Sequence, residues 1–126
     1  MIPKIVKLKK IKTQKGHILK FVDKDFKYFK KFGEIYFNEV KKNKKSDWIF
    51  HKKNQCLMSV INGKIKFEIK FKNKKKKILL SRKILRLLII PKKIWFRFQA
   101  LQDNSILANF INNRHADNEV IKKSDK

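Results

Sequence analysis

The sequence VINGKIKFEIKF, residues 60–71, contains the clearest structural signal in the chain. Charged residues alternate there with apolar residues at Ile65, Phe67, Ile69 and Phe71. This period of two is typical of a half-buried β-strand over 64–71. Asn-Gly, at 62–63, favours a two-residue hairpin turn, and the apolar segment at 55–61 can supply the partner strand. We therefore predict a β-hairpin over 55–71.

Short apolar segments recur along the rest of the chain. We predict further strands at 17–22, 34–40, 77–80, 85–90, 94–99 and 105–111. Residues 23–32 carry phenylalanines at helical spacing after an aspartate, which predicts a short helical turn, and the lysine-rich residues 73–77 predict a polar loop. Many short strands with little helix indicate an all-β sandwich or barrel, and an eight-stranded jelly roll best fits the count.

The length and composition suit one globular domain. The chain has 126 residues, of which 42% are hydrophobic and 11 are phenylalanine, so a real core is expected. Three glycines and two prolines exclude low-complexity or collagen-like material. We predict a single domain over 1–126, with its core at about 15–117 and a polar, frayed tail at 118–126.

Cysteine usage and hydropathy indicate the compartment. The single cysteine, Cys56, has no partner for an internal disulfide, so nothing indicates an oxidising environment. The first residues contain no continuous apolar stretch of the kind found in signal peptides. The longest apolar runs fall far short of the ~20 residues that span a bilayer. We therefore expect a cytoplasmic protein that does not associate with a membrane.

The net charge of +25 comes almost wholly from lysine, which is spread along the whole chain. The accompanying abundance of Ile, Asn and Phe is typical of general compositional drift, whereas surfaces selected to hold nucleic acid tend to cluster arginine with lysine. Both interpretations stay open. Either one predicts weak, salt-sensitive binding of polyanions, including nucleic acid.

Several segments together resemble a known family. The chain is similar, over about 33–120, to the short dTDP-4-dehydrorhamnose 3,5-epimerase-like proteins of the cupin superfamily. The matching segments keep the family's order and spacing: GEIYFNEV at 33–40, Trp48 with HKK at 51–53, VINGKIKFEI at 60–69, LLIIPKKIWFRFQAL at 87–101 and LANFINNRHADNEV at 107–120. The resemblance implies a cupin jelly roll, in agreement with the strand pattern. It also implies a homodimer and a cytoplasmic nucleotide-sugar epimerase or isomerase of surface-polysaccharide biosynthesis.

The family chemistry removes a proton next to a ketone and needs a base of histidine strength. The resemblance makes His51 that base, acting on a dTDP-linked 4-keto-6-deoxy sugar without a cofactor. It implies that Lys52, Lys53 and Arg97 lie near the diphosphate and that Asn109 lies near the keto oxygen. It further implies substrate contacts from Gln55, Trp95, Phe98 and His115. Because side chains alternate along a strand, Trp48 and Phe50 should face one way, and Ile49 and His51 the other, toward the barrel interior.

Some family positions carry other residues here. Asn109 stands where full-length epimerases have a tyrosine acid, and an amide is a poor proton donor. Phe96 stands where a second histidine is frequent in the family. Ile49, two residues before His51, stands where another histidine is often found, and Pro91-Lys92-Lys93 replaces Pro-Pro-Gly. Without closely spaced histidines, no metal site is expected. Two alternatives follow: a catalytically silent cupin that binds a sugar nucleotide, and a basic β-barrel that binds nucleic acid.

Overall fold

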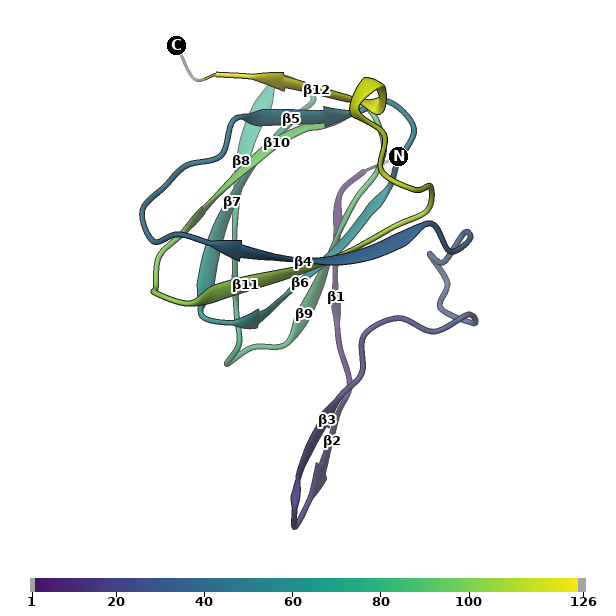
Figure 1. The fold of residues 1–126 in the computed structure, drawn as a ribbon, viewed down its shortest axis with the longest axis vertical. Coiled ribbons are helices and arrows are strands. Elements are labelled where there is room, and N and C mark those ends of the chain that lie inside the picture. The colour runs from purple at the N-terminus through teal and green to yellow at the C-terminus, as the bar shows by residue number, and fades with distance from the viewer. Residues whose placement is uncertain (1, 125–126) are drawn as a thin grey trace.

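The computed structural model describes residues 2–124, and its strands form two facing antiparallel sheets (Figure 1). One sheet has the order β1-β9-β6-β11-β4, with bounds Lys4–Lys7, Arg86–Ile90, Cys56–Asn62, Ser105–Ile111 and Glu34–Val40. The other has the order β12-β5-β10-β7-β8, with bounds Val120–Lys123, Trp48–His51, Trp95–Ala100, Lys64–Phe71 and Lys74–Ser81. This architecture confirms the predicted all-β jelly roll.

The hairpin predicted at 55–71 joins the two sheets. β6 ends at Asn62, Gly63 turns the chain with φ +79°, and β7 begins at Lys64. A side chain at Gly63 would collide with Ser105, so both the backbone angle and the space there favour glycine. The two strands then separate: β6 pairs with β9 and β11, whereas β7 pairs with β8 and β10. The turn thus crosses between the layers.

The main core lies between the sheets. The alternating side chains Ile65, Phe67 and Ile69 are fully buried and belong to one apolar cluster with Met58 and Val60. Burying an apolar side chain of this size contributes about 1.5–3 kcal/mol. The core fills the interior near β7 and β8 and leaves space toward β4, β5 and β12, where the polar side chains of the next subsection lie.

A second apolar cluster covers the outer face of the β1-containing sheet. Residues 21–29 run across it as an irregular strap that contributes Phe21, Phe26 and Phe29, among others. Phe29 contacts Phe110 edge to face, with 5.7 Å between the ring centroids. The helical turn predicted at 23–32 is therefore wrong, because these aromatic residues form successive turns that pack against the sheet.

Two polar segments also differ from prediction. The predicted loop at 73–77 lies mostly in β8, which pairs with β7 from Lys74 to Ser81. The predicted frayed tail at 118–126 begins inside a 3-10 turn, η1 (Asp117–Glu119), and residues 120–123 form β12, which pairs with β5. Residues 125 and 126 of that tail lie outside the described residues. Pairing with a neighbouring strand provides hydrogen-bond partners for the backbone N–H and C=O groups of these segments, despite their polar side chains.

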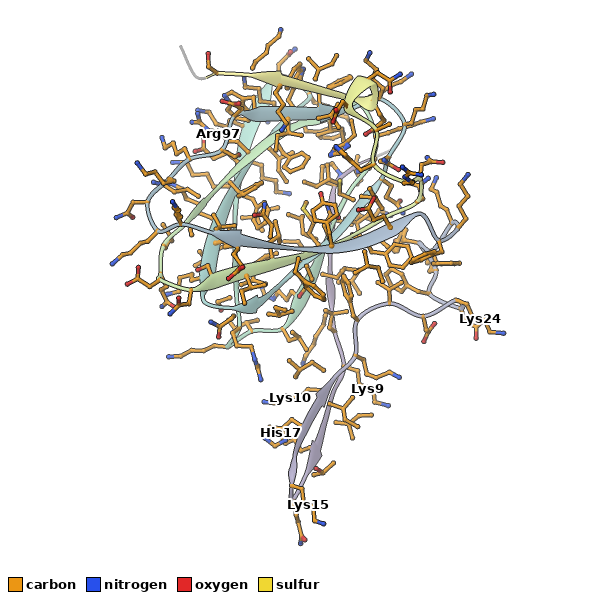
Figure 2. All side chains as sticks on the ribbon, in the orientation of Figure 1. Lys9, Lys10, Lys15, His17, Lys24 and Arg97 are labelled. Carbon is orange, nitrogen blue, oxygen red and sulfur yellow. The ribbon has the colours of Figure 1, made fainter. Side chains whose placement is uncertain are left out.

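A small hairpin projects from the body of the molecule (Figures 1 and 2). β2 (Lys10–Thr13) and β3 (Gly16–Leu19) pair only with each other and form a separate two-stranded sheet. Nearly all their residues are exposed, including Ile11 and Ile18. Among residues 2–124, no helix has the length and apolar character needed to cross a membrane.

Candidate active site

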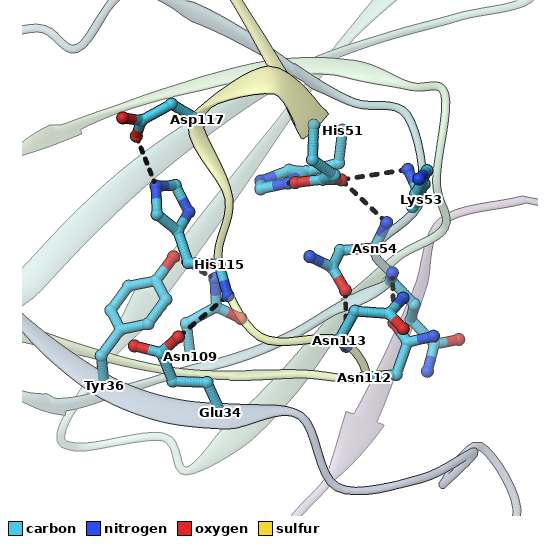
Figure 3. Close-up of polar contacts among 12 residues, drawn as sticks. Glu34, Tyr36, His51, Lys53, Asn54, Asn109, Asn112, Asn113, His115 and Asp117 are labelled. Atoms are coloured by element: carbon cyan, nitrogen blue, oxygen red, sulfur yellow. Dashed lines mark hydrogen bonds and ion pairs between the residues drawn. The ribbon is translucent and has the colours of Figure 1, made fainter.

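A pocket between the two sheets gathers residues from both of them. Four predicted site residues line it, namely His51, Phe98, Asn109 and His115. The remaining lining residues are Tyr36, Asn38, Ile49, Met58, Phe96, Leu107, Val120 and Lys122. His51 enters from β5, and Tyr36 and Asn109 enter from β4 and β11 of the facing sheet. The pocket therefore places an imidazole opposite a phenol and an amide (Figure 3).

His51 is held by a buried carboxylate. Its Nδ1 lies 2.9 Å from Glu119 Oε2, and the residue is only 6% exposed. The ring stacks on Phe96, with 6.1 Å between centroids and an interplanar angle of 16°. When Nδ1–H donates a hydrogen bond to the carboxylate, the neutral ring carries its lone pair on Nε2. The pair thus fixes both the orientation and the tautomer that a general base requires.

Glu119 is stabilised as an anion by converging donors. The backbone amides of Lys53 and Asn54 donate to Oε1 at 3.0 and 2.9 Å. Burial by itself would raise the pKa of Glu119, but the hydrogen bonds from His51 and these two amides outweigh it and hold the pKa below its usual value. Glu119 is therefore ionised at neutral pH and favours a proton on His51 Nδ1.

The loop after β5 is fastened to the C-terminal segment by further hydrogen bonds. Gln55 N donates to Asn112 Oδ1 at 2.8 Å, and Asn113 N donates to Asn54 Oδ1 at 2.7 Å (Figure 3).

The turn before β10 also contacts the end of β5, because Lys93 N donates to the carbonyl of His51 at 2.7 Å. Lys93 has φ +65°, a left-handed conformation that favours glycine, which is the residue the related family has at this turn.

Tyr36 and Asn109 are direct neighbours across β4 and β11. Asn109 Nδ2 donates to the Tyr36 hydroxyl at 2.8 Å. Burial raises the pKa of Tyr36 to about 12, so the phenol is protonated at neutral pH. Since its oxygen already accepts a hydrogen bond, the Tyr36 O–H is free to serve as a donor toward a bound ligand.

His115 and two carboxylates lie at the edge of the pocket. The backbone N of His115 donates to Glu34 Oε1 at 3.0 Å, and its Nε2 lies 3.3 Å from Asp117 Oδ1. His115 is exposed, in contrast to His51. This arrangement places His115 at the entrance of the pocket.

The structure does not bring the other predicted residues into the pocket. Lys52 and Lys53 are exposed in the loop after β5, and the Gln55 side chain donates to the Tyr28 carbonyl at 2.8 Å. Trp95 and Arg97 lie on the outer face of their sheet, because they alternate along β10 with the pocket-lining Phe96 and Phe98. Trp95 and Phe98 are three residues apart and so cannot both face the pocket.

Arg97 belongs to a separate cluster on that outer face. Its Nη2 lies 3.2 Å from each carboxylate oxygen of Glu68, and its guanidinium lies 4.5 Å from the Trp48 ring centroid. Burial would raise the pKa of Glu68, but Arg97 and Lys75 lower it overall. The predicted opposition of Trp48 and His51 is confirmed: Trp48 faces this cluster, and Ile49 and His51 face the pocket.

Three residues that line the pocket or hold His51 were not predicted from the sequence: Tyr36, Glu119 and Lys122. A signal existed for Glu119, because the related family ends its final motif with a glutamate at this spacing. The alternation of the strand over 34–40 did not identify Tyr36, since its role depends on pairing with Asn109. Within residues 2–124, no group of three or more His, Cys, Asp or Glu side chains is placed to hold a metal ion.

Solved structures with the same fold include several nucleotide-sugar enzymes. A dTDP sugar isomerase from Desulfovibrio desulfuricans G20 is 28% identical, with a TM-score of 0.87 and coverage of 95% of this chain and 82% of that one. The sugar 3,4-ketoisomerase QdtA from Thermoanaerobacterium thermosaccharolyticum, solved with TDP, is 21% identical, with a TM-score of 0.84 and coverage of 94% and 86%.

The epimerase RmlC from Legionella pneumophila, solved with dTDP-4-keto-L-rhamnose, is 15% identical, with a TM-score of 0.83 and coverage of 95% and 71%. At such identities, the likenesses to QdtA and RmlC show the fold alone. A search of curated proteins finds no match. The resemblance to RmlC-like cupins seen in the sequence is confirmed. The model of the family described as "FdtA: WxcM-like, C-terminal" matches residues 1–126, and the chain belongs to that family.

Proposed function

We propose that this protein is an isomerase of a dTDP-linked 4-keto-6-deoxy sugar, with His51 as the base. The observation that carries the proposal is the buried His51–Glu119 pair, whose imidazole lines a pocket between the sheets. A carboxylate-oriented imidazole has the strength needed to remove a proton next to a ketone. The similar dTDP sugar isomerase and the 3,4-ketoisomerase QdtA support the substrate class.

Asn109 in the position of the family's tyrosine acid favours movement of the keto group over epimerisation, because an amide is a poor proton donor. Inverting a stereocentre needs a proton donor on the face opposite the base. A 3,4-ketoisomerisation needs one base: it removes the C3 proton, an enediol forms across C3 and C4, and the base returns the proton to C4. The second proton passes from the C3 oxygen to the C4 oxygen. Atoms and electrons balance without a cofactor.

Tyr36 is suited to handle that second proton. Its hydroxyl lies in the same pocket as His51 and comes from the facing sheet. The Asn109 amide donates to its oxygen and leaves its O–H available to donate to a ligand. We assign to Tyr36 the polarisation of the keto oxygen and the transfer of the proton between oxygens. Asn109, which stands in the position of the family's tyrosine, then acts by positioning this phenol.

Isotope exchange tests the proposed reaction. The protein is incubated with dTDP-4-keto-6-deoxyglucose in deuterated water, and NMR follows the keto position and deuterium incorporation. The expected result is a 3-keto product that carries deuterium at C4, together with exchange at C3 of the substrate. His51→Ala should abolish both. Deuterium at C3 and C5 with an inverted product would instead establish a 3,5-epimerase.

The same experiment addresses a catalytically silent protein. Binding of dTDP without any exchange or product would overturn the catalytic proposal and leave the binding role. Tyr36→Phe provides the finer test, since it removes one oxygen and little volume. We expect kcat to fall by about 10²-fold, within the range for removal of a general acid, while dTDP affinity changes little.

The projecting hairpin supports a homodimer. A lone two-stranded hairpin is marginally stable in water, and exposed strand edges favour pairing with another chain. β2 and β3 nevertheless form an extended hairpin with exposed Ile11 and Ile18. We propose that it packs on a second copy of the chain. Light scattering should show a dimer for the full chain and a monomer when residues 10–19 are replaced by a short Gly-Ser linker.

A further inference from the structure

The proposed substrate carries a diphosphate that needs a cation at the pocket. The lysines and arginine first considered for this role, Lys52, Lys53 and Arg97, do not line the pocket. Among the described lining residues, Lys122 is the single lysine or arginine. His115, the other lining residue at the edge that can carry positive charge, already lies beside Asp117. The positive charge at this pocket therefore comes chiefly from β12.

Strand alternation directs Lys122 to the pocket. Val120 and Lys122 line it, whereas Lys123 lies on the other face with its Nζ 5.1 Å from the Trp95 ring centroid. Val120 is opposite His51 in the strand register, and Lys122 is opposite Ile49. Two residues along a strand span about 7 Å, a separation comparable to the width of a hexose ring. Lys122 is thus one sugar ring away from the base.

Burial gives the ligand a direction. His51 is buried, whereas Lys122 is exposed although it lines the same pocket. An uncharged sugar ring can enter the buried end, where Phe96 and Met58 also line the wall. A diphosphate keeps much of its hydration at the open end and still reaches an ammonium group.

We propose that Lys122 binds the diphosphate of the nucleotide sugar and directs the keto sugar toward His51. This inference rests on the proposed function, because it names the residue that holds the substrate's charged part. It makes the C-terminal segment a part of the site twice over: Glu119 orients the base, and Lys122 anchors the substrate.

Two adjacent lysines provide a matched test. Lys122→Met and Lys123→Met remove the same charge from neighbouring residues that face opposite sides of one strand. Calorimetry with dTDP should show affinity lowered about tenfold or more for Lys122→Met, the loss expected for a charge-assisted hydrogen bond. Lys123→Met should change it less than about twofold, as expected for screened surface charge. Lys122→Arg should restore most of the affinity.

Further readouts separate this role from a structural one. Thymidine lacks the diphosphate and, by ligand-observed NMR, should bind wild type and Lys122→Met alike. In turnover, Lys122→Met should raise KM more than it lowers kcat. Equal dTDP affinities for Lys122→Met and Lys123→Met would overturn the inference alone. Failure of the wild-type protein to bind dTDP would overturn the proposed function together with it.

Discussion

Two buried carboxylates lie on opposite faces of one sheet and show how similar pairs acquire different uses. Glu119 pairs with His51 at the pocket, and Glu68 pairs with Arg97 on the outer face. Each basic side chain also lies against an aromatic ring, Phe96 for His51 and Trp48 for Arg97. Burial opposes ionisation of both carboxylates, yet in each case the partners lower the pKa.

The difference lies in the basic partner. Arginine remains charged at all ordinary pH values, so the Arg97–Glu68 pair is a fixed structural contact. Histidine can gain and lose a proton near neutrality, and the Nδ1 contact of His51 leaves its other nitrogen for chemistry. The location follows the same division, since His51 lines the pocket and Arg97 does not. Similar pairing therefore suits the proposed catalysis on one face and stability on the other.

Removing the imidazole is the strongest way to test this division. His51→Ala should lower isotope exchange by about 10²–10⁴-fold, the usual contribution of a general base. The chain should still fold, because the backbone amides of Lys53 and Asn54 still hold Glu119. Exchange by NMR and circular dichroism on the same sample check both parts. Undiminished exchange would exclude His51 as the base.

The converse change should affect stability first. Arg97→Met leaves Glu68 buried without its main partner, and breaking such a pair typically costs about 3–5 kcal/mol. Lys75 Nζ, 3.4 Å from Glu68, keeps part of the compensation. Urea unfolding measures the loss, and the folded protein should turn over substrate within a few-fold of wild type. The double variant Glu68→Met/Arg97→Met should recover much of the stability; if it does not, the pair is more than a static contact.

The two carboxylates can be compared by the same substitution. Glu119→Gln should lower kcat by about 10–100-fold, as loss of a carboxylate that orients a histidine does elsewhere. Glu68→Gln should leave kcat within about threefold, since Glu68 faces away from the pocket. Steady-state kinetics with the keto-sugar substrate give both values. Equal losses for the two variants would remove the functional distinction between the faces.

The smallest expected effect is the contribution of Glu119 and Glu68 to the pH dependence of stability, which acid unfolding measures. Because their folded-state pKa values are lowered, each contributes stability that is complete above the unfolded value of about 4.3 and is lost as pH falls through the folded pKa. Urea midpoints measured from pH 6 down to pH 3 should therefore decline for wild type. Glu119→Gln and Glu68→Gln should each start lower and decline less. A parallel decline in all three proteins would contradict the lowered folded-state pKa values of Glu119 and Glu68.

The strand pattern predicted much of the fold and the direction of single side chains. Alternation over 64–71 and at 48–51 depends only on neighbours along the chain, so the hairpin and the inward direction of His51 could be predicted. The polar strands could not, because β8 and β12 exist through pairing with β7 and β5. Lysine-rich residues 74–77 show no alternation of their own.

Residues of the pocket could be predicted where one residue suffices and were missed where two must meet. His51 and Asn109 could be identified by position in a motif. The Tyr36 hydroxyl became relevant only through the β4–β11 register, which places it opposite Asn109. Lys52, Lys53 and Arg97 were expected near the diphosphate but do not line the pocket, because closeness in sequence to His51 or to Trp95 does not specify a face of the sheet. Lys122 lay in a segment predicted to be frayed.

The His51–Glu119 contact also has a kinetic consequence, because its two residues are 68 positions apart. Contacts between distant residues form slowly, since the chain must close a long loop before the interaction repays the lost entropy. β12 lies at the edge of its sheet and pairs there with β5, so the body of the jelly roll can form before β12 joins it. During refolding, recovery of turnover should lag behind recovery of β-sheet signal, and enzyme activity would report the arrival of this last strand.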